Sequence, residues 1–262
     1  MFPALSPGRY LLGVLPWYSV MIITGILLAI ILCEREEKRL GLPADTVIDL
    51  ALRLVPCGVV GARLYYVAFS WEAFADNPLS ILYVWQGGLA IYGGVIGGLI
   101  AVVVFAWRRK LPPLLLTDMI VPTLALAQAI GRWGNYFNME AYGAEITDPA
   151  WQFFPAGVLI PEGGAYVWHM ATFFYESMWN LTVFLILWFV IRRRKQRHGV
   201  VTLWYALLYG TGRFLIEGLR TDSLMSGSLR VSQVLSAALA LGAACALTAL
   251  VILKHRKKME AA

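Results

Sequence analysis

Seven long apolar stretches divide this chain, and they decide what it can fold into. Each is close to the ~20 residues that an α-helix needs to cross the hydrocarbon core of a bilayer. Only 15% of the residues are charged, whereas a soluble domain carries about a quarter. We therefore expect an all-α integral membrane protein with seven transmembrane helices. The expected spans are residues 17–33, 46–69, 89–107, 114–133, 172–191, 200–217 and 231–253.

Basic residues gather after the first, third, fifth and seventh of these stretches. Cytoplasmic loops carry an excess of Lys and Arg, so this alternation predicts an N-terminus outside the cell and a cytoplasmic C-terminus. The net charge of +6 is then an anchoring pattern rather than a sign of nucleic-acid binding. We expect residues 1–262 to form a single polytopic membrane domain, with residues 134–171 as a loop on the outer face. The basic residues are Arg35, Lys38, Arg39, Arg108, Arg109, Lys110, Arg192, Arg193, Arg194, Lys195, Arg197, Lys254, Arg256, Lys257 and Lys258.

A dense polar cluster, GRWGNYFNMEAYG at residues 131–143, follows the fourth apolar stretch. An arginine at membrane depth is costly unless it meets water, an anion or a partner, and lipid does not tolerate irregular backbone. We therefore expect a tightly turning segment that lines a cavity enclosed by protein. Arg132 suits bidentate binding of a phosphate, although a lone arginine at a helix end can also reach the interface for purely structural reasons. The other candidates are Asn135, Asn138 and Glu140, which can orient hydroxyls or hold the arginine, and Gly143, which admits a ligand close to the backbone.

A second polar stripe lies in the sixth apolar stretch, in YGTGRFLIE at residues 209–217. Tyr209, Arg213 and Glu217 are spaced four apart and share one helix face. The stripe is either an internal ion pair that fixes helix packing or a second contact to phosphate or glycerol. Glu176, in the fifth stretch, needs a cationic partner inside the membrane, and Arg132 and Arg213 are the candidates.

The pattern G-R-x-G-N-aromatic-x-N-x-E-x-x-G at residues 131–143 resembles the motif of the prolipoprotein diacylglyceryl transferases. These are bacterial membrane enzymes that attach a lipid to the cysteine of lipoprotein precursors. Residues 209–217 resemble the family's Y-x-x-x-R-x-x-x-E, and residues 218–224 continue as in its Gram-positive branch. Residues 168–177 resemble its H-P-T-x-x-Y-E-S stretch, with one residue inserted and the proline missing. The three motifs occur in family order.

This resemblance implies transfer of diacylglyceryl from phosphatidylglycerol to the lipobox cysteine of a prolipoprotein signal peptide, in the bacterial cytoplasmic membrane. Glycerol phosphate leaves, so arginines aimed at the phosphate would stabilise the transition state. We expect Arg132 and Arg213 to bracket one headgroup. The implied catalytic residues are Arg132, Arg213, Tyr92 and Glu217. The implied phosphatidylglycerol-binding residues are Arg132, Asn135, Asn138, Glu140, Gly143, Tyr18, Tyr209 and Glu176.

Tyr92 departs from the family pattern, because some members carry a histidine there, proposed as the base that activates the thiol. A tyrosine, with an ordinary pKa of about 10, is a poor base at neutral pH, so we expect an orienting role. A histidine metal site is not expected, because the three histidines are scattered, and no cofactor is expected. The three cysteines, Cys33, Cys57 and Cys245, are expected to be buried and inert.

Two other interpretations remain open on the sequence. Buried arginines, an acidic partner and the glycine-rich helix at residues 93–98 also suit a transporter or channel for an anion or lipid. A lipid-binding scaffold without catalysis would explain the arginines too. Against a transporter, no inverted repeat is visible in the sequence, and the charges cluster toward one face rather than the midplane. A scaffold would not explain three motifs that match one enzyme family. The glycines themselves predict close helix packing, and Arg63 is expected to contact lipid headgroups or backbone carbonyls at a helix end.

Overall fold

The computed structural model describes residues 8–194, 196–221, 223, 225–227 and 229–259. Lys195, Asp222 and Leu224, which belong to patterns discussed above, lie outside the described residues. The chain divides into two compact units. The first joins Met1–Ala29 to Ile120–Ala262, and the second comprises Ile30–Met119.

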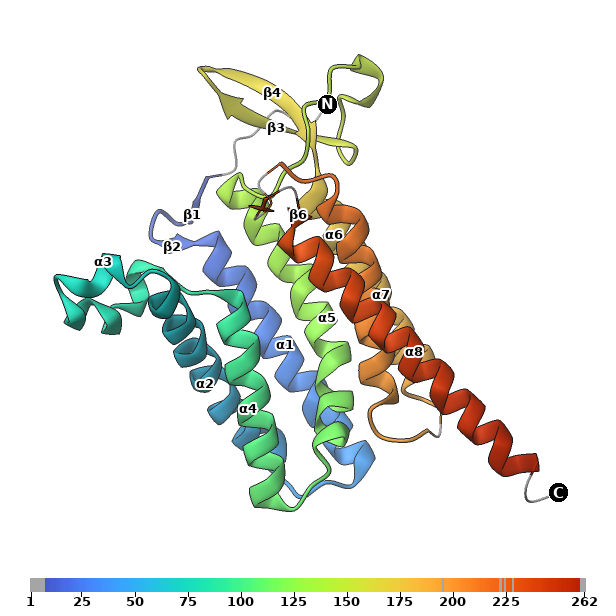
Figure 1. The fold of residues 1–262 in the computed structure, drawn as a ribbon. Coiled ribbons are helices and arrows are strands. Elements are labelled where there is room, and N and C mark those ends of the chain that lie inside the picture. Colours follow the sequence, from blue (N-terminus) through green and yellow to red (C-terminus); the bar gives the residue numbers. More distant parts are fainter. Residues whose placement is uncertain (1–7, 195, 222, 224, 228, 260–262) are drawn as a thin grey trace. The chain divides into compact units, whose positions relative to one another are not determined.

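Helices make up most of the described chain (Figure 1). Every predicted span corresponds to a helix whose start lies within two residues of the predicted start. Helices α1, α4, α5 and α8 extend beyond the predicted ends. The long helices are α1 (Trp17–Leu40), α2 (Thr46–Phe69), α4 (Ile91–Arg109), α5 (Pro113–Asn138), α6 (Thr172–Leu185) continued by η4 (Ile186–Ile191), α7 (Val200–Glu217) and α8 (Val231–Met259). The short ones are α3 (Glu72–Ala75), η1 (Pro78–Leu82), η2 (Val84–Gln86) and η3 (Pro149–Trp151).

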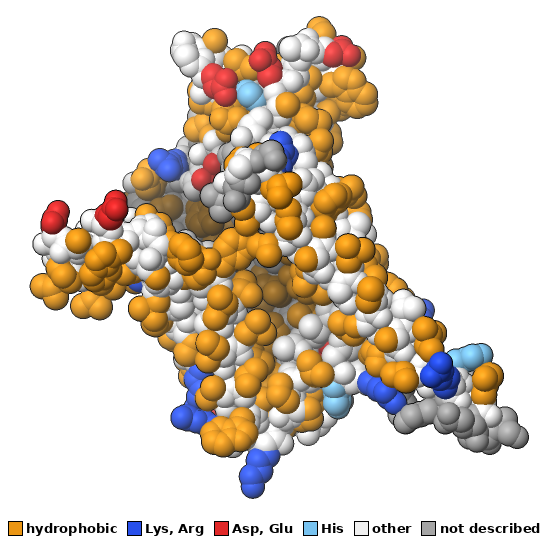
Figure 2. Space-filling view, viewed as in Figure 1, with side chains coloured by type: hydrophobic (Ala, Val, Ile, Leu, Met, Phe, Trp, Pro, Cys, Tyr) orange, Lys and Arg blue, Asp and Glu red, His pale blue; other side chains and the backbone are white. Residues whose placement is uncertain are grey.

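Among the described residues, five helical segments are long and apolar enough to cross a membrane: α1, α4, α5, α6 with η4, and α8. Their outward side chains are largely apolar, and Figure 2 shows hydrophobic side chains along the visible flanks of the helices. Both observations fit a helical membrane protein. Helices α2 and α7 coincide with predicted spans but are not among the five, so seven spans and their orientation stay predictions.

In the second unit, α2 and α4 pack backbone against backbone. A Cβ added at Gly61 would lie 2.5 Å from the carbonyl oxygen of Gly93 and 3.0 Å from Cα of Gly97. The predicted close packing is confirmed for Gly93 and Gly97 but not for Gly98, whose added Cβ would have nothing within 4 Å. Near the end of α2, the Arg63 guanidinium donates to backbone carbonyls of the segment that leads into α4, as expected. The acceptors are Ser80 (2.7 Å), Ile81 (2.8 Å), Gly87 (2.7 Å) and Gly88 (3.1 Å).

In the first unit, helix α6 is tied to both α5 and α7. The hydroxyl of Ser177 in α6 donates to the carbonyl of Ala129 in α5 at 2.8 Å. The indole of Trp179 donates to the carbonyl of Leu208 in α7 at 2.9 Å. Polar side chains that reach neighbouring carbonyls are a usual means of joining apolar helices in membranes. Helix α6 can therefore present one side chain to both of its neighbours.

The segment between α5 and α6 contains regular structure that the sequence analysis did not predict. Strands β3 (Gly157–Glu162) and β4 (Ala165–Met170) form an antiparallel hairpin beyond the ends of α5 and α6 (Figure 1). The predicted loop at 134–171 also begins too early, because residues 134–138 complete α5. Two further pairs are only two residues long in each strand: β1 (Tyr10–Leu11) with β2 (Leu15–Pro16), and β5 (Met225–Ser226) with β6 (Leu229–Arg230).

All three cysteines were expected to be buried, but only one of them is. Cys33 is buried, whereas Cys57 and Cys245 are exposed. Both lie on helices, and a thiol behaves as a small apolar group that can face lipid as readily as a protein core. Apolar surroundings in the sequence therefore did not distinguish the two environments.

Candidate active site

Helix α5 carries the first part of the polar cluster on its last two turns. The expected tight turn from Gly131 onward is wrong, because the helix continues to Asn138 and only residues 139–143 leave it. Aromatic packing supports this extension: Trp133 meets Phe173 of α6 edge to face, and Phe137 stacks on Trp17. Arg132, Asn135 and Asn138, spaced by three, consequently lie on one side of a helix.

Glu176 of α6 is 2% exposed and binds two arginines. Arg132 donates to its Oε1 at 2.5 Å, and Arg213 donates to its Oε2 at 2.9 Å. Both expected partners of Glu176 are therefore present together. A buried carboxylate is costly unless it is paired and hydrogen-bonded, and two guanidinium groups meet that need.

Arg213 also contacts Glu217, one turn further along α7, with 2.6 Å between Nη2 and Oε2. The ion pair, one of the two alternatives that their spacing left open, is therefore present. Glu217 is 1% exposed, so the pair lies inside the protein. Two arginines and two glutamates make this part of the site formally neutral.

Glu140, in the segment after α5, extends the contacts on the other side of Arg132. Its Oε1 accepts from Asn135 at 2.9 Å and from Asn138 at 3.2 Å. The Oδ1 of Asn135 accepts from Arg132 at 3.4 Å. A continuous chain of contacts, hereafter the polar network, therefore joins seven of the predicted site residues. These are Asn138, Glu140, Asn135, Arg132, Glu176, Arg213 and Glu217.

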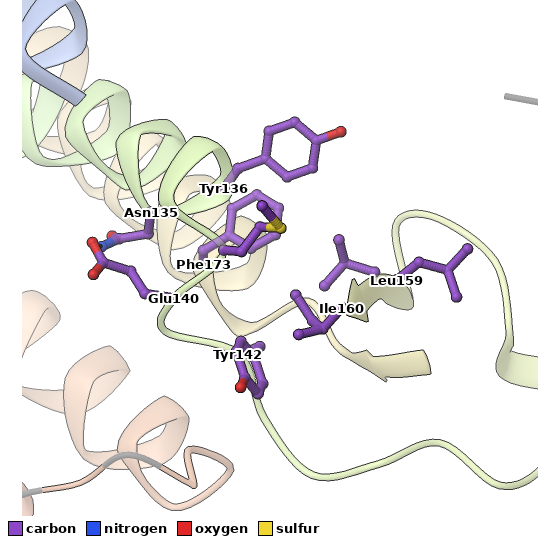
Figure 3. Close-up of a pocket in the computed structure, with 9 residues that line it drawn as sticks. Asn135, Tyr136, Glu140, Tyr142, Leu159, Ile160 and Phe173 are labelled. Atoms are coloured by element: carbon purple, nitrogen blue, oxygen red, sulfur yellow. Dashed lines mark hydrogen bonds between the residues drawn. The ribbon is translucent and has the colours of Figure 1, made fainter. Parts of the chain in front are cut away.

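A small pocket adjoins one end of the polar network (Figure 3). Asn135 and Glu140 lie close together on one side of it, and apolar side chains of strand β3 lie on the other. The pocket has therefore one polar and one apolar wall. Its lining residues are Asn135, Tyr136, Met139, Glu140, Tyr142, Val158, Leu159, Ile160 and Phe173.

Comparison with known proteins identifies the family. The family profile described as "Prolipoprotein diacylglyceryl transferase" matches residues 11–249. The chain belongs to this family. It is 44% identical over 247 residues to the phosphatidylglycerol–prolipoprotein diacylglyceryl transferase of Limosilactobacillus reuteri, covering 92% of this chain and 87% of the relative. It is 45% identical over 245 residues to the enzyme of that name from Bacillus cereus, covering 89% and 88%. The predicted resemblance is thus confirmed.

Four further residues that the transferase resemblance singled out lie outside the contacts of the polar network given above. Gly143 packs against protein: an added Cβ would lie 2.7 Å from the Leu219 carbonyl oxygen and 2.9 Å from Cβ of Met170. Tyr18 is 38% exposed, and its ring covers Gly134 of α5. Tyr209 stacks on Tyr205, with 5.3 Å between ring centroids. Tyr92 belongs to the second unit, where its ring is tilted against Tyr65.

Two residues of this transferase were not recognised from the sequence as part of the site. The hydroxyl of Thr172 donates to the carbonyl of Ala141 at 2.6 Å. His169 is 6% exposed and places Nδ1 2.9 Å from the carbonyl oxygen of Gly143. Both fall within the stretch that resembles the family's third motif, and that position was the signal that could have identified them.

Proposed function

We propose that this chain transfers the diacylglyceryl group of phosphatidylglycerol to the cysteine thiol of prolipoproteins in the bacterial cell membrane, the first step of lipoprotein maturation. The names of its relatives and the apolar helices support this activity and its setting. The observation that carries the assignment of the site is the pair of arginines, Arg132 and Arg213, held from different helices by the single carboxylate of Glu176.

The reaction exchanges one bond at a glycerol carbon. The cysteine sulfur forms a C–S bond to that carbon while the C–O bond to the phosphate breaks. The electron pair of the broken bond passes to the phosphate oxygen, and glycerol phosphate leaves. The thiol proton is taken up by the released phosphate or by solvent. Negative charge therefore builds on the phosphate, and fixed guanidinium groups near it lower the barrier.

Arg132 and Arg213 are suited to this task because each guanidinium has five N–H donors, more than the contacts given above with other described residues occupy. They are also partly accessible, with side chains 21% and 15% exposed. The anion between them here is the Glu176 carboxylate, so we infer that phosphate approaches the open faces of the two guanidinium groups rather than inserting between them. Glu176 and Glu217 then hold the arginines in place, and Asn135, Asn138 and Glu140 orient Arg132 and the glycerol hydroxyls.

We further propose seven membrane spans, with the N-terminus and residues 139–171 outside and the C-terminus in the cytoplasm, in a single membrane domain. Helices α2 and α7 contain 24 and 18 residues, close to the ~20 that a span requires. In a cysteine-free background, Thr147→Cys should react with an impermeant maleimide on intact cells, and His198→Cys only after permeabilisation. The opposite pattern would overturn this orientation.

The activity is tested with labelled phosphatidylglycerol in vesicles that contain the purified protein and a lipobox peptide. We expect label to appear on the peptide with the wild type and to be lost with Arg132→Ala and Arg213→Ala. Arg53→Ala, which removes an exposed arginine from α2, is the matched control and should retain transfer. Movement of label across the bilayer without transfer would indicate a transporter instead, and binding without turnover would indicate a scaffold.

A further inference from the structure

Glu140 is held between two residues with unusual backbone conformations. Met139 and Ala141 have φ angles of 52° and 58°, in the left-handed region, and neither is glycine. A side chain with a Cβ occupies this region at a cost in free energy, and such strain persists only where surrounding contacts impose it. Residues 139–143, hereafter the Glu140 loop, must therefore be held by neighbouring structure.

The holding contacts come from residues 169–172, where strand β4 passes into helix α6. Thr172 donates its hydroxyl hydrogen to the carbonyl of Ala141, one of the two strained residues, at 2.6 Å. The backbone N–H of Gly143 donates to the carbonyl of Met170 at 2.9 Å. His169 lies with Nδ1 2.9 Å from the Gly143 carbonyl oxygen, and a carbonyl can only accept, so Nδ1 carries the donated hydrogen.

Both of these side chains are buried, Thr172 at 1% and His169 at 6% exposure, so water does not compete for their hydrogen bonds. The other nitrogen of His169 lies 3.2 Å from Glu162 at the end of β3. His169 belongs to strand β4, so the hydrogen bond of its Nδ1 joins the β3–β4 hairpin to the Glu140 loop. Thr172 sits at the first residue of α6, one turn before Glu176. The side chains of Thr172 and His169, which hold the Glu140 loop, are hereafter called the clamp. Its Thr172 and the arginine-binding carboxylate of Glu176 consequently lie on the same helix.

The Glu140 loop in turn determines how Arg132 is presented. Glu140 accepts from Asn135, and Asn135 accepts from Arg132. We propose that Thr172 and His169 are positioning residues: they hold the strained Glu140 loop in the one conformation that lets Glu140 fix Asn135 and so orient Arg132. This inference rests on the proposed function, because Arg132 is the group that it serves.

The proposal predicts a specific change in the kinetics of transfer. Without the clamp, Ala141 relaxes to an ordinary conformation and Glu140 moves away from Asn135. Arg132 stays in the protein, bound to Glu176, but its guanidinium is no longer held toward the phosphate. The peptide-binding surface is not changed directly. The rate of the chemical step should therefore fall while the KM for peptide stays nearly constant.

The test compares Thr172→Val with Thr172→Ser. Valine keeps the shape of threonine without the hydroxyl, and serine keeps the hydroxyl. We expect Thr172→Val to lower kcat by about tenfold or more with a KM for peptide within about twofold of wild type, and Thr172→Ser to retain most of the activity. Equal loss in both variants, or no loss in Thr172→Val, would overturn the proposal.

A second substitution separates clamping of the strained loop from general packing. Glycine adopts the left-handed region freely, so Ala141→Gly removes the strain that Thr172 opposes. We expect Ala141→Gly to restore kcat by about threefold or more when added to Thr172→Val, whereas loss of packing alone would not be repaired this way. Failure of this rescue contradicts the proposal.

His169 offers the same comparison should Thr172→Val not fold. Asparagine can donate an amide hydrogen toward Gly143 and leucine cannot, so His169→Asn should be the more active of the two. A leucine variant as active as the asparagine variant would count against the clamp. If the wild type itself does not transfer lipid, the proposed function fails. If the wild type is active and Thr172→Val is indistinguishable from it, only the clamp fails.

Discussion

Arg132 of α5 and Arg213 of α7 both bind the carboxylate of Glu176 in α6, one through each oxygen. The three helices therefore meet at a single buried charge. Removing that charge while keeping the side-chain shape leaves two arginines facing each other without the anion between them. Because both arginines remain, the effect of losing the Glu176 charge on stability can be measured separately from its effect on activity.

We expect Glu176→Gln to abolish transfer and to lower the free energy of unfolding by about 3–5 kcal/mol, the usual cost of removing one partner from a buried ion pair. Unfolding of the purified protein in detergent and transfer to a lipobox peptide measure the two effects. Glu72→Gln, an exposed acid of α3, is the control and should change neither. A Glu176→Gln protein as stable as wild type would show that the two arginines find other partners.

Gly134 and Gly131 form a matched pair on α5. A Cβ at Gly134 would lie 2.7 Å from the Tyr18 ring, whereas at Gly131 it would meet only the tip of Ile22 at 3.4 Å. We expect Gly134→Ala to destabilise the protein by about 1–3 kcal/mol through overpacking. Gly131→Ala should be neutral or stabilising by up to about 1 kcal/mol, because alanine favours a helix. Thermal unfolding of both variants checks this, and equal effects would show that the Tyr18 ring moves aside.

Gly61 and Gly98 provide a similar contrast in the second unit. Gly61 of α2 has backbone of α4 within 3.0 Å of its added Cβ, whereas Gly98 of α4 has nothing within 4 Å. Gly61→Ala should force α2 and α4 apart and cost about 1–3 kcal/mol, and Gly98→Ala should not destabilise. The unfolding temperature of each variant is the measurement. A harmless Gly61→Ala would mean that this helix pair separates at little cost.

Tyr92→Phe tests the expected orienting role of this tyrosine. Loss of a general base usually lowers the rate by about 10²–10⁴-fold. An orienting hydroxyl contributes less, so we expect kcat to fall by no more than about tenfold. The measurement is the initial rate of transfer at saturating lipid and peptide. A fall of about 100-fold or more would assign proton transfer to Tyr92 after all.

The helices were largely predictable because membrane spans depend on local properties. An apolar run of sufficient length must satisfy its backbone internally, so it forms a helix whatever surrounds it. Helices α2 and α7 therefore begin and end at the predicted residues. The extension of α5 to Asn138 was missed because two glycines suggested a break. Packing of Trp133 and Phe137 on other parts of the first unit outweighs the weak helix preference of glycine.

The candidate site likewise has one part that the sequence determined and another that only the tertiary structure decided. The pairing of Arg213 with Glu217 follows from a spacing of four on one helix, so the sequence determined it. That Arg132 and Arg213 share Glu176 was decided by the tertiary structure, because these residues are 44 and 37 positions from Glu176. So was the hold of Thr172 on Ala141 across 31 positions. Composition and periodicity define which helices form, but the rotation of each helix against its neighbours, set by side-chain packing, determines which of their polar groups meet.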